Sequence, residues 1–190
     1  MQNNYINTKK RKEFIMKRII FIMIAIMFIL TSCTAKPLEV TPEVKEDSTL
    51  SMLKDGKTTF NYQGYINLKC PQMDSADSVK INNITYTENK NGTLTVHKGG
   101  NNTFSPDDIT NIEKDAQDKS KYSEYTFSKS DIEVKDKTST IKLQYLISNV
   151  SPDVKKEDIV RTVKMTMTLL NGKGKTIGTK DVEFKLPDNS

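Results

Sequence analysis

An alternation of apolar and polar residues with a period of two runs through most of the chain after Thr58. This period places one face of each segment in a core, and a half-buried sheet needs a second apolar layer to cover that face. The pattern predicts a mainly β chain with roughly seven or eight short strands in an antiparallel two-layer sandwich. The predicted inward-facing residues are Phe60, Tyr62, Ile66, Leu68, Val79, Ile81, Leu94, Val96, Tyr125, Phe127, Ile141, Leu143, Tyr145, Ile147, Val163, Met165, Met167, Leu169, Ile177, Val182, Phe184 and Leu186.

Asparagine-containing segments interrupt the alternation and predict turns. The apolar parity changes across Asn82 and Asn83, so we expect a β-bulge there. Asn91-Gly92 accepts the positive φ angles of a tight turn, and we expect it to close a β-hairpin between residues 79–86 and 94–96. A second turn is expected in the sequence NGKG, before the last strand.

One short connecting helix is expected in the segment SPDDITNIEKDA. Ser105 is suited to cap the first turn, Pro106 to open the helix, and two acidic residues follow where the helix dipole favours them. Ile109 and Ile112 fall on one stripe with Ala116, which predicts one buried face.

The N-terminal part of the chain follows a different pattern. Met16, Lys17 and Arg18 precede an unbroken run of twelve apolar residues, 19–30. A helix needs about twenty residues to cross a bilayer core, whereas a secretory signal needs only such a short run. We therefore expect residues 1–32 to be a signal peptide, with Met16 as an alternative start. An uncleaved signal or a plain N-terminal anchor is the competing interpretation.

The apolar run ends in Leu30-Thr31-Ser32-Cys33. This sequence resembles the lipobox of bacterial lipoproteins, which is an aliphatic residue, two small residues and a cysteine. The resemblance implies that Cys33 carries a lipid and becomes the first mature residue, with Leu30, Thr31 and Ser32 as the signal-peptidase recognition residues. It places the protein in the bacterial cell envelope, extracytoplasmic and anchored to the membrane through lipid, since two or more acyl chains anchor stably.

Residues 33–57 are expected to form a flexible tether. They contain Pro37, Pro42, many charged residues and few large apolar side chains, a composition typical of extended linkers. The predicted organisation is therefore a signal peptide over residues 1–32, a tether over 33–57 and a β-sandwich domain over 58–190.

The C-terminal part, residues 125–186, resembles the FxLYD type of extracellular immunoglobulin-like domain. The resemblance is based on LISNVS at one strand end and on VKMTMTLLNGKGKTIG as a strand, turn and strand. Leu170 stands where that family usually has an aromatic residue. The resemblance implies an immunoglobulin-like sandwich and no catalytic chemistry.

The net charge of +5 comes entirely from the N-terminal segment. Residues 1–32 hold six Lys or Arg and one Glu, whereas residues 33–190 hold 23 basic and 23 acidic residues. Nucleic-acid binding needs a surface of one sign that replaces counterions on the phosphates. The neutral remainder predicts no nucleic-acid partner.

Two residues are candidate centres of catalysis or cross-linking. His97 is the single histidine, and its outward strand parity predicts a surface residue rather than a base. Cys70 is the one thiol left if Cys33 is lipidated, which indicates a buried free thiol or an intermolecular bridge, with burial favoured. Without lipidation, a disulfide between Cys33 and Cys70 is the competing explanation.

Two groups of residues are candidate metal sites. The acidic group has neither the spacing nor the turn glycine of a calcium loop and is expected on a solvated helix face. Among the methionines, Met165 and Met167 are expected in the core, because they share the inward parity of their strand. The acidic group is Asp107, Asp108, Glu113, Asp115 and Asp118, and the methionines are Met52, Met73, Met165 and Met167.

These observations predict a non-enzymatic envelope lipoprotein with no cofactor, no metal and no catalytic residues. Its partners would be the membrane and an unknown envelope protein or glycan. The alternative is a small envelope hydrolase or an enzyme inhibitor on the same β scaffold, the inhibitor using a protruding KGGNNTFSPDD loop. A subunit of a larger envelope assembly is a third reading.

Overall fold

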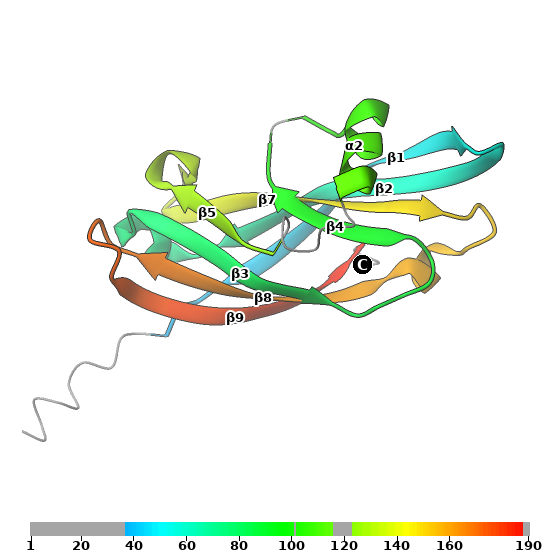
Figure 1. The fold of residues 1–190 in the computed structure, drawn as a ribbon. Coiled ribbons are helices and arrows are strands. Elements are labelled where there is room, and N and C mark those ends of the chain that lie inside the picture. The colour runs from blue at the N-terminus through cyan, green and yellow to red at the C-terminus, as the bar shows by residue number, and fades with distance from the viewer. Residues whose placement is uncertain (1–36, 101, 116–122, 188–190) are drawn as a thin grey trace, which may run out of the picture. The chain divides into compact units, whose positions relative to one another are not determined.

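Two antiparallel sheets packed face to face make up the fold in Figure 1. The computed structural model describes residues 37–100, 102–115 and 123–187, all in the unit that begins at Pro37. Sheet A contains, in spatial order, β1 (Thr41–Lys54), β2 (Lys57–Lys69), β7 (Thr138–Val150) and β4 (Thr93–Lys98), with β6 (Glu133–Lys135) also paired to β7. Sheet B contains β5 (Tyr125–Ser128), β3 (Ser78–Tyr86), β8 (Arg161–Leu170) and β9 (Thr176–Leu186). The predicted antiparallel sandwich is confirmed.

In the part of the chain that the structure describes, four short helices connect these strands. The α-helix α2 (Pro106–Asp115) lies between β4 and β5 in the chain. The 3-10 helices are η1 (Pro71–Ser75), η3 (Lys129–Asp131) and η4 (Lys156–Ile159). Among the described residues, α2 is the one α-helix, as the sequence predicted.

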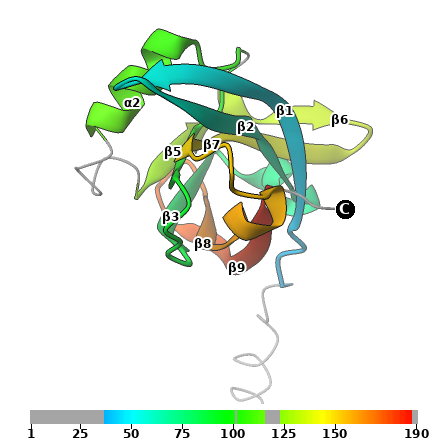
Figure 2. The same cartoon turned by 90° about the vertical axis from the view of Figure 1, so that its right-hand side faces the viewer.

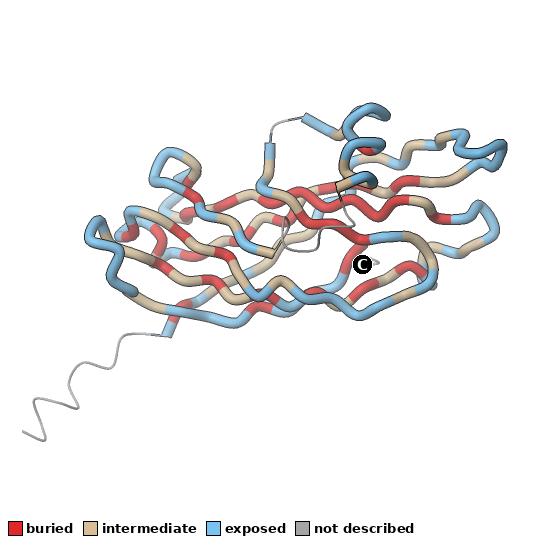
Figure 3. The backbone as a smooth tube through the Cα atoms, in the orientation of Figure 1, coloured by how far each residue is buried: buried red, intermediate tan, exposed pale blue. Residues whose placement is uncertain are grey.

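The core lies between the two sheets and contains most of the residues that the alternation pointed inward; Phe60, Tyr62, Tyr125, Ile177 and Phe184 are partly buried and pack against it. Burial alternates along β8, where Val163, Met165, Met167 and Leu169 are buried between half-buried or exposed neighbours. Figure 3 shows this alternation along the strands of sheet B, whereas β7 of sheet A is buried without a break from Leu143 to Ser148. Met165 and Met167 are core residues, as predicted.

The predicted bulge in β3 is confirmed. Its register against β8 shifts between Asn82 and Thr85, and Asn83 adopts a φ of 53°. An asparagine accepts this left-handed backbone more easily than most residues do. The bulge turns the side chains of Asn82 and Asn83 away from the core.

The predicted hairpin at Asn91-Gly92 is wrong, because β3 and β4 lie in different sheets. β3 pairs with β8 and β5, whereas β4 pairs with β7. Gly92 does have a positive φ of 89°. The turn lies in the segment that connects β3 of sheet B to β4 of sheet A. Asn91 Nδ2 donates to the Asp158 carbonyl at 3.3 Å, and the Arg161 guanidinium donates to the Asn91 and Gly92 carbonyls.

The expected tether is wrong over residues 41–57. β1 pairs with β2 along its whole length, from Thr41 opposite Lys69 to Lys54 opposite Lys57. Asp55 and Gly56, with φ of 50° and 73°, close this hairpin. Most of β1 is exposed because it is an edge strand, so its sequence lacks the apolar alternation of the inner strands.

A segment after β4 covers the outer face of sheet A. Ser105 and Asp108 cap the first turn of α2 reciprocally, with Ser105 N donating to Asp108 Oδ2 at 2.9 Å and Asp108 N to Ser105 Oγ at 3.2 Å. Ile109 is fully buried, and Glu113 pairs with Lys54 of β1 at 2.6 Å. Figure 2 shows α2 lying across β1 and β2.

Two buried glutamines hold the same segment to the sheet. The Gln63 side chain accepts from Phe104 N at 2.7 Å and donates to the Phe104 carbonyl at 3.2 Å. Gln144 donates to the Asn102 carbonyl at 2.6 Å and accepts from Gly100 N at 3.1 Å. We call residues 99–115, apart from residue 101, the strap.

Candidate functional site

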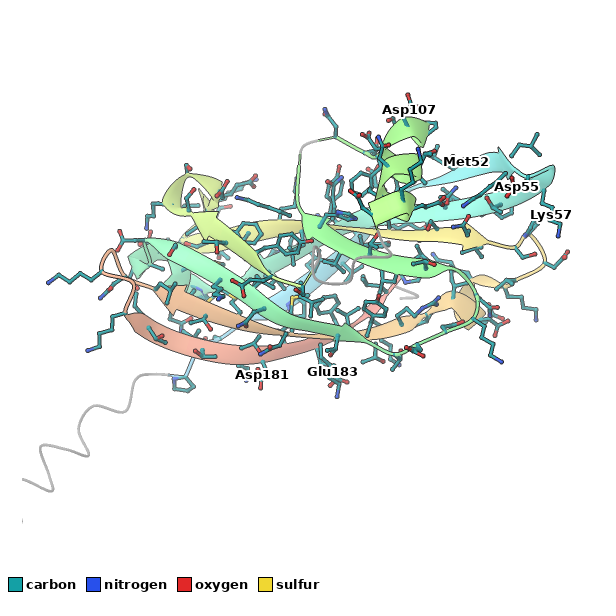
Figure 4. All side chains as sticks on the ribbon, viewed as in Figure 1. Met52, Asp55, Lys57, Asp107, Asp181 and Glu183 are labelled. Carbon is teal, nitrogen blue, oxygen red and sulfur yellow. The ribbon has the colours of Figure 1, made fainter. Side chains whose placement is uncertain are left out.

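The outer face of sheet B is a polar surface that no described element covers. Its side chains alternate with the core residues of β3, β8 and β9 and form rows across the three strands. Figure 4 shows Asp181 and Glu183 projecting from β9 on the side away from α2, which carries Asp107. We call this surface the open face; its members are Lys80, Asn82, Asn83, Lys164, Thr166, Thr168, Thr179, Asp181 and Glu183.

A chain of hydrogen bonds crosses the open face. Asn83 Nδ2 donates to Thr166 Oγ1 at 3.3 Å, and Thr166 Oγ1 donates to Asp181 Oδ1 at 2.9 Å. Beside it, Lys164 and Glu183 form an ion pair at 3.1 Å. These hydrogen bonds hold the Asp181 carboxylate in place on the surface, and the carboxylate oxygens keep further lone pairs that can accept from a ligand.

A shallow hollow of about 390 Å³ lies over the hydrogen bonds that join Asn83, Thr166 and Asp181. The bulge contributes Asn83 to its wall, and the remaining walls come from β8 and β9, including Lys164, Thr166, Asp181 and Glu183. Close by, the Asn82 side-chain oxygen is buried and accepts no hydrogen bond from the described residues. Carboxylate, amide and hydroxyl groups together can bind the hydroxyls of a glycan or the polar backbone of a peptide.

A second hollow, also of about 390 Å³, lies at the end of the sandwich beside Arg161. Tyr86, Glu88, Lys90 and Leu94 line it. Arg161 is only 1% exposed. Burial lowers the pKa of its guanidinium. The guanidinium donates to the carbonyls of Ile159, Asn91 and Gly92, so it clamps the crossing between the sheets and is not presented to a ligand.

A third hollow, of about 280 Å³, lies between β4 and η3. Lys98 pairs with Asp131 at 2.9 Å and lies over the Phe127 ring at 5.1 Å. Hydrogen bonds from Lys98 and Ser128 lower the pKa of Asp131 to about 2. Each charge in this pair therefore already has a partner, which favours a structural role.

His97 is half-buried, so the prediction of a surface residue is wrong. Its outward parity is as expected, but the strap covers that side of the sheet. The ring lies edge-on to Phe104 with centroids 5.1 Å apart, and Nε2 lies 3.1 Å from Thr95 Oγ1. Desolvation by this burial lowers the pKa of His97 to about 4, which makes it a poor base near neutral pH.

Cys70 is a buried free thiol, as predicted. Its Sγ donates to Gln72 Oε1 at 3.2 Å, and burial raises its pKa. A buried thiol with a raised pKa is a weak nucleophile. The structure thus gives Cys70 a packing role.

The acidic group of the strap separates into individual structural roles. Asp108 caps α2, Glu113 pairs with Lys54, and Asp107 is exposed. Asp118 lies outside the described residues. Within the described ranges, no group of three or more His, Cys, Asp or Glu is placed to hold a metal ion.

The predicted lipid-attachment residue Cys33 and the recognition residues Leu30, Thr31 and Ser32 lie outside the described residues. The sequence did not predict the open face as a site. The one local sequence feature that falls on this face is the change of apolar parity at Asn82 and Asn83. No helix in the described part of the chain is both long and apolar enough to span a membrane.

No family model, no curated protein and no solved structure matches this chain. The β-sandwich rests on the structure itself, and the immunoglobulin-like resemblance of residues 125–186 stays a prediction.

Proposed function

We propose that this protein is a non-enzymatic lipoprotein of the bacterial cell envelope, anchored through lipid on Cys33, whose sandwich binds an envelope protein or a glycan. The observation that carries the proposal is the position of Leu30-Thr31-Ser32-Cys33 directly before a folded domain that begins at Pro37. A lipid at this position would hold the sandwich on a membrane without an apolar patch of its own.

The open face supports the binding part of the proposal. It is polar, it contains the ordered chain Asn83, Thr166 and Asp181, and no described element covers it. On sheet A, by contrast, the strap covers the outward side chains of Gln63 and Gln144. The neutral charge balance after residue 32 argues for a ligand recognised by hydrogen bonds rather than by long-range attraction.

Mass spectrometry of the membrane-extracted protein tests the anchor. We expect a mature chain that starts at Cys33 and carries acyl groups, and we expect Cys33→Ala to lose both the added mass and the partition into detergent. Cys70→Ala is the matched control, since it removes a thiol that the fold buries, and it should keep the lipid. An unmodified, uncleaved N-terminus in the wild type would contradict the proposal.

Site-specific photo-crosslinking in intact envelopes tests the binding surface. A photoreactive residue at Thr168 on the open face should give a defined adduct, whereas one at Asp107 on α2 should not. The adduct at Thr168 should weaken when Asp181→Asn removes the ordered carboxylate. Equal adducts at both positions, or an adduct that ignores Asp181→Asn, would contradict binding at the open face.

A small hydrolase is the second candidate, and two observations favour it. Glu88 lines a hollow beside the exposed Tyr86, and Asp181 and Glu183 share the open face. Glycoside hydrolysis usually needs two facing carboxyl groups. If the protein cleaves envelope glycans, Asp181→Asn with Glu183→Gln, or Glu88→Gln, should abolish product release. For the inhibitor, the described part of the KGGNNTFSPDD loop is held to sheet A by Gln63 and Gln144 rather than protruding.

A further inference from the structure

The folded domain begins almost immediately after the proposed lipid site. The Leu38 side chain is only 6% exposed, and it packs so closely on Gly178 that a Cβ there would lie 2.9 Å from Leu38 Cδ2. Four residues separate Cys33 from Leu38. A fully extended chain spans at most about 3.6 Å per residue, so Leu38 lies within about 18 Å of a lipidated Cys33.

The strand register shows which end of the sandwich this short link reaches. Thr41 pairs with Lys69, Lys69 pairs with Thr140, and Thr140 pairs with Glu133, which places all four in one row across sheet A. The β6–β7 turn lies beyond this row. We call this end of the sandwich, where β1 begins, the entry end. It also holds Leu38, η1 and the β8–β9 turn, and it lies at the left in Figure 1.

The opposite end of the sandwich lies a full strand length away. It holds the β1–β2 turn at Asp55 and Gly56, the crossing segment 87–92 and residues 151–155. β2 has 13 residues. At about 3.3 Å per residue, the two ends are roughly 40 Å apart. A link of the length found here brings the entry end to the membrane and leaves the far end away from it.

The entry end presents one exposed apolar residue and charged residues of both signs. Val134 of β6 is 57% exposed. Lys135 and Lys137 flank the same turn, and Lys173 and Lys175 project from the β8–β9 turn; all four are exposed and form no ion pair among the described residues. The acidic residues there include Glu39, Asp74, Glu133, Asp136 and Asp77, the last of which lies beside Gly172.

We propose that the entry end of the sandwich lies against the membrane surface, with the β6–β7 and β8–β9 turns at the lipid headgroups. The proposal rests on the lipid anchor at Cys33 proposed above. Exposed apolar residues alone do not decide the orientation, because Leu53 at the far end is 77% exposed. The length of the link decides the orientation, because the lysines of the two turns are balanced by acidic residues at the same end. Partners would then meet the open face or the far end.

Fluorescence quenching on vesicles tests this orientation with a matched pair of sites. Asp136 and Asp55 each occupy a hairpin turn at a φ of 50°, one at each end of the sandwich. Asp136→Cys and Asp55→Cys are labelled in the lipidated protein, where Cys33 is acylated and Cys70 is buried. On phosphatidylcholine–phosphatidylglycerol vesicles with a headgroup quencher, the label at 136 should be quenched several-fold more than the label at 55.

The outcomes separate this inference from the proposed function. Equal or reversed quenching in protein that stays on the vesicles would overturn the orientation and leave the anchor standing. Failure of the wild type to bind vesicles, with no acyl mass, would overturn the anchor itself. Inserting a 24-residue Gly-Ser linker between Lys36 and Pro37 should reduce the quenching at 136 several-fold; unchanged quenching would overturn the argument from link length.

Discussion

The outer faces of the two sheets are built from the same alternation and end in opposite environments. On sheet A the outward side chains of Gln63 and Gln144 are buried beneath the strap, whereas on sheet B Thr166 and Asp181 stay half-buried or exposed. The side chains of Gln63 and Gln144 point away from the core between the sheets, yet these residues are only 2% and 5% exposed. Polar outward residues therefore do not by themselves indicate a solvent-exposed face.

Hydrogen-bond geometry explains how polar residues on sheet A tolerate burial. Each glutamine offers an acceptor and a donor, and the strap backbone satisfies both, as a neighbouring strand would. The covered face is thus held mainly by polar contacts, with Ile109 as its single fully buried apolar residue on α2. Four predictions compare the covered face with the open one.

Ile109→Ala should have the largest effect. The side chain is fully buried between α2 and sheet A, so its truncation leaves a cavity and should cost about 4 kcal/mol of unfolding free energy. Urea denaturation followed by circular dichroism measures the loss. Ile112→Ala, at a half-buried position of the same helix, is the control and should cost less than half as much. Equal losses would mean that α2 is not anchored through Ile109.

Acidification should also weaken the covered face. The pKa of His97 falls from 6.5 to about 4 on folding, so the unfolded chain binds a proton that the folded chain does not. Stability is complete above pH 6.5 and falls as the pH drops toward 4, by at most about 3 kcal/mol.

Chemical denaturation at pH 7 and pH 4.5 measures this loss, and His97→Gln is the control. The variant should lose clearly less stability over the same interval, because the carboxylates titrate in both proteins. The pKa of Asp131 is lowered from 3.8 to about 2, so the stability that this carboxylate contributes is lost only below pH 4.5, outside the measured interval. Identical pH dependence in wild type and variant would show that His97 is not buried on folding.

Gln63→Ala should cost about 2 kcal/mol, because it leaves the N–H and carbonyl of Phe104 without their side-chain partners. Hydrogen exchange at the Phe104 amide should accelerate more than exchange in β8. Thr168→Ala on the open face is the control, with a loss within about 0.5 kcal/mol. Unchanged exchange at Phe104 would mean that Gln63 does not hold the strap.

Local patterns in the sequence predicted the sandwich, its core and its helix. Period-two alternation located the inner residues of β2, β7 and β8, and the Ser105 cap located α2. These features depend on neighbours close in sequence. The Asn82 and Asn83 bulge is of the same kind, because a parity change is visible within a few residues.

Features that depend on distant partners were predicted wrongly. β1 is a strand because β2 pairs with it, and its edge position tolerates Pro42 and many charges. The Asp55-Gly56 pair was the signal that could have revealed this hairpin. Gly92 specifies a turn but not which sheet receives the next strand. His97 has the expected parity, but whether another segment covers it is decided by the Gln63 and Gln144 contacts.

The candidate site could not be predicted from the sequence, because it too depends on residues that are distant in the chain. Asn83, Thr166 and Asp181 lie on three strands and meet only through the pairing of β3, β8 and β9. No spacing along the chain marks them as a group. The lipobox residues, in contrast, are contiguous, and their role stays a prediction.

The smallest expected effect compares two threonines directly. Thr95, on the covered face, is 6% exposed and lies 3.1 Å from His97 Nε2, whereas Thr166 links Asn83 to Asp181 on the open face. Thr95→Val should cost about 1 kcal/mol, since it removes a buried hydroxyl from a hydrogen bond. Thr166→Val should change stability by no more than about 0.5 kcal/mol, because water replaces the lost partner and valine favours a strand. Thermal denaturation of both variants measures the difference. A loss at Thr166 as large as that at Thr95 would show that sheet B is covered as sheet A is, and the open face would then be excluded as a binding surface.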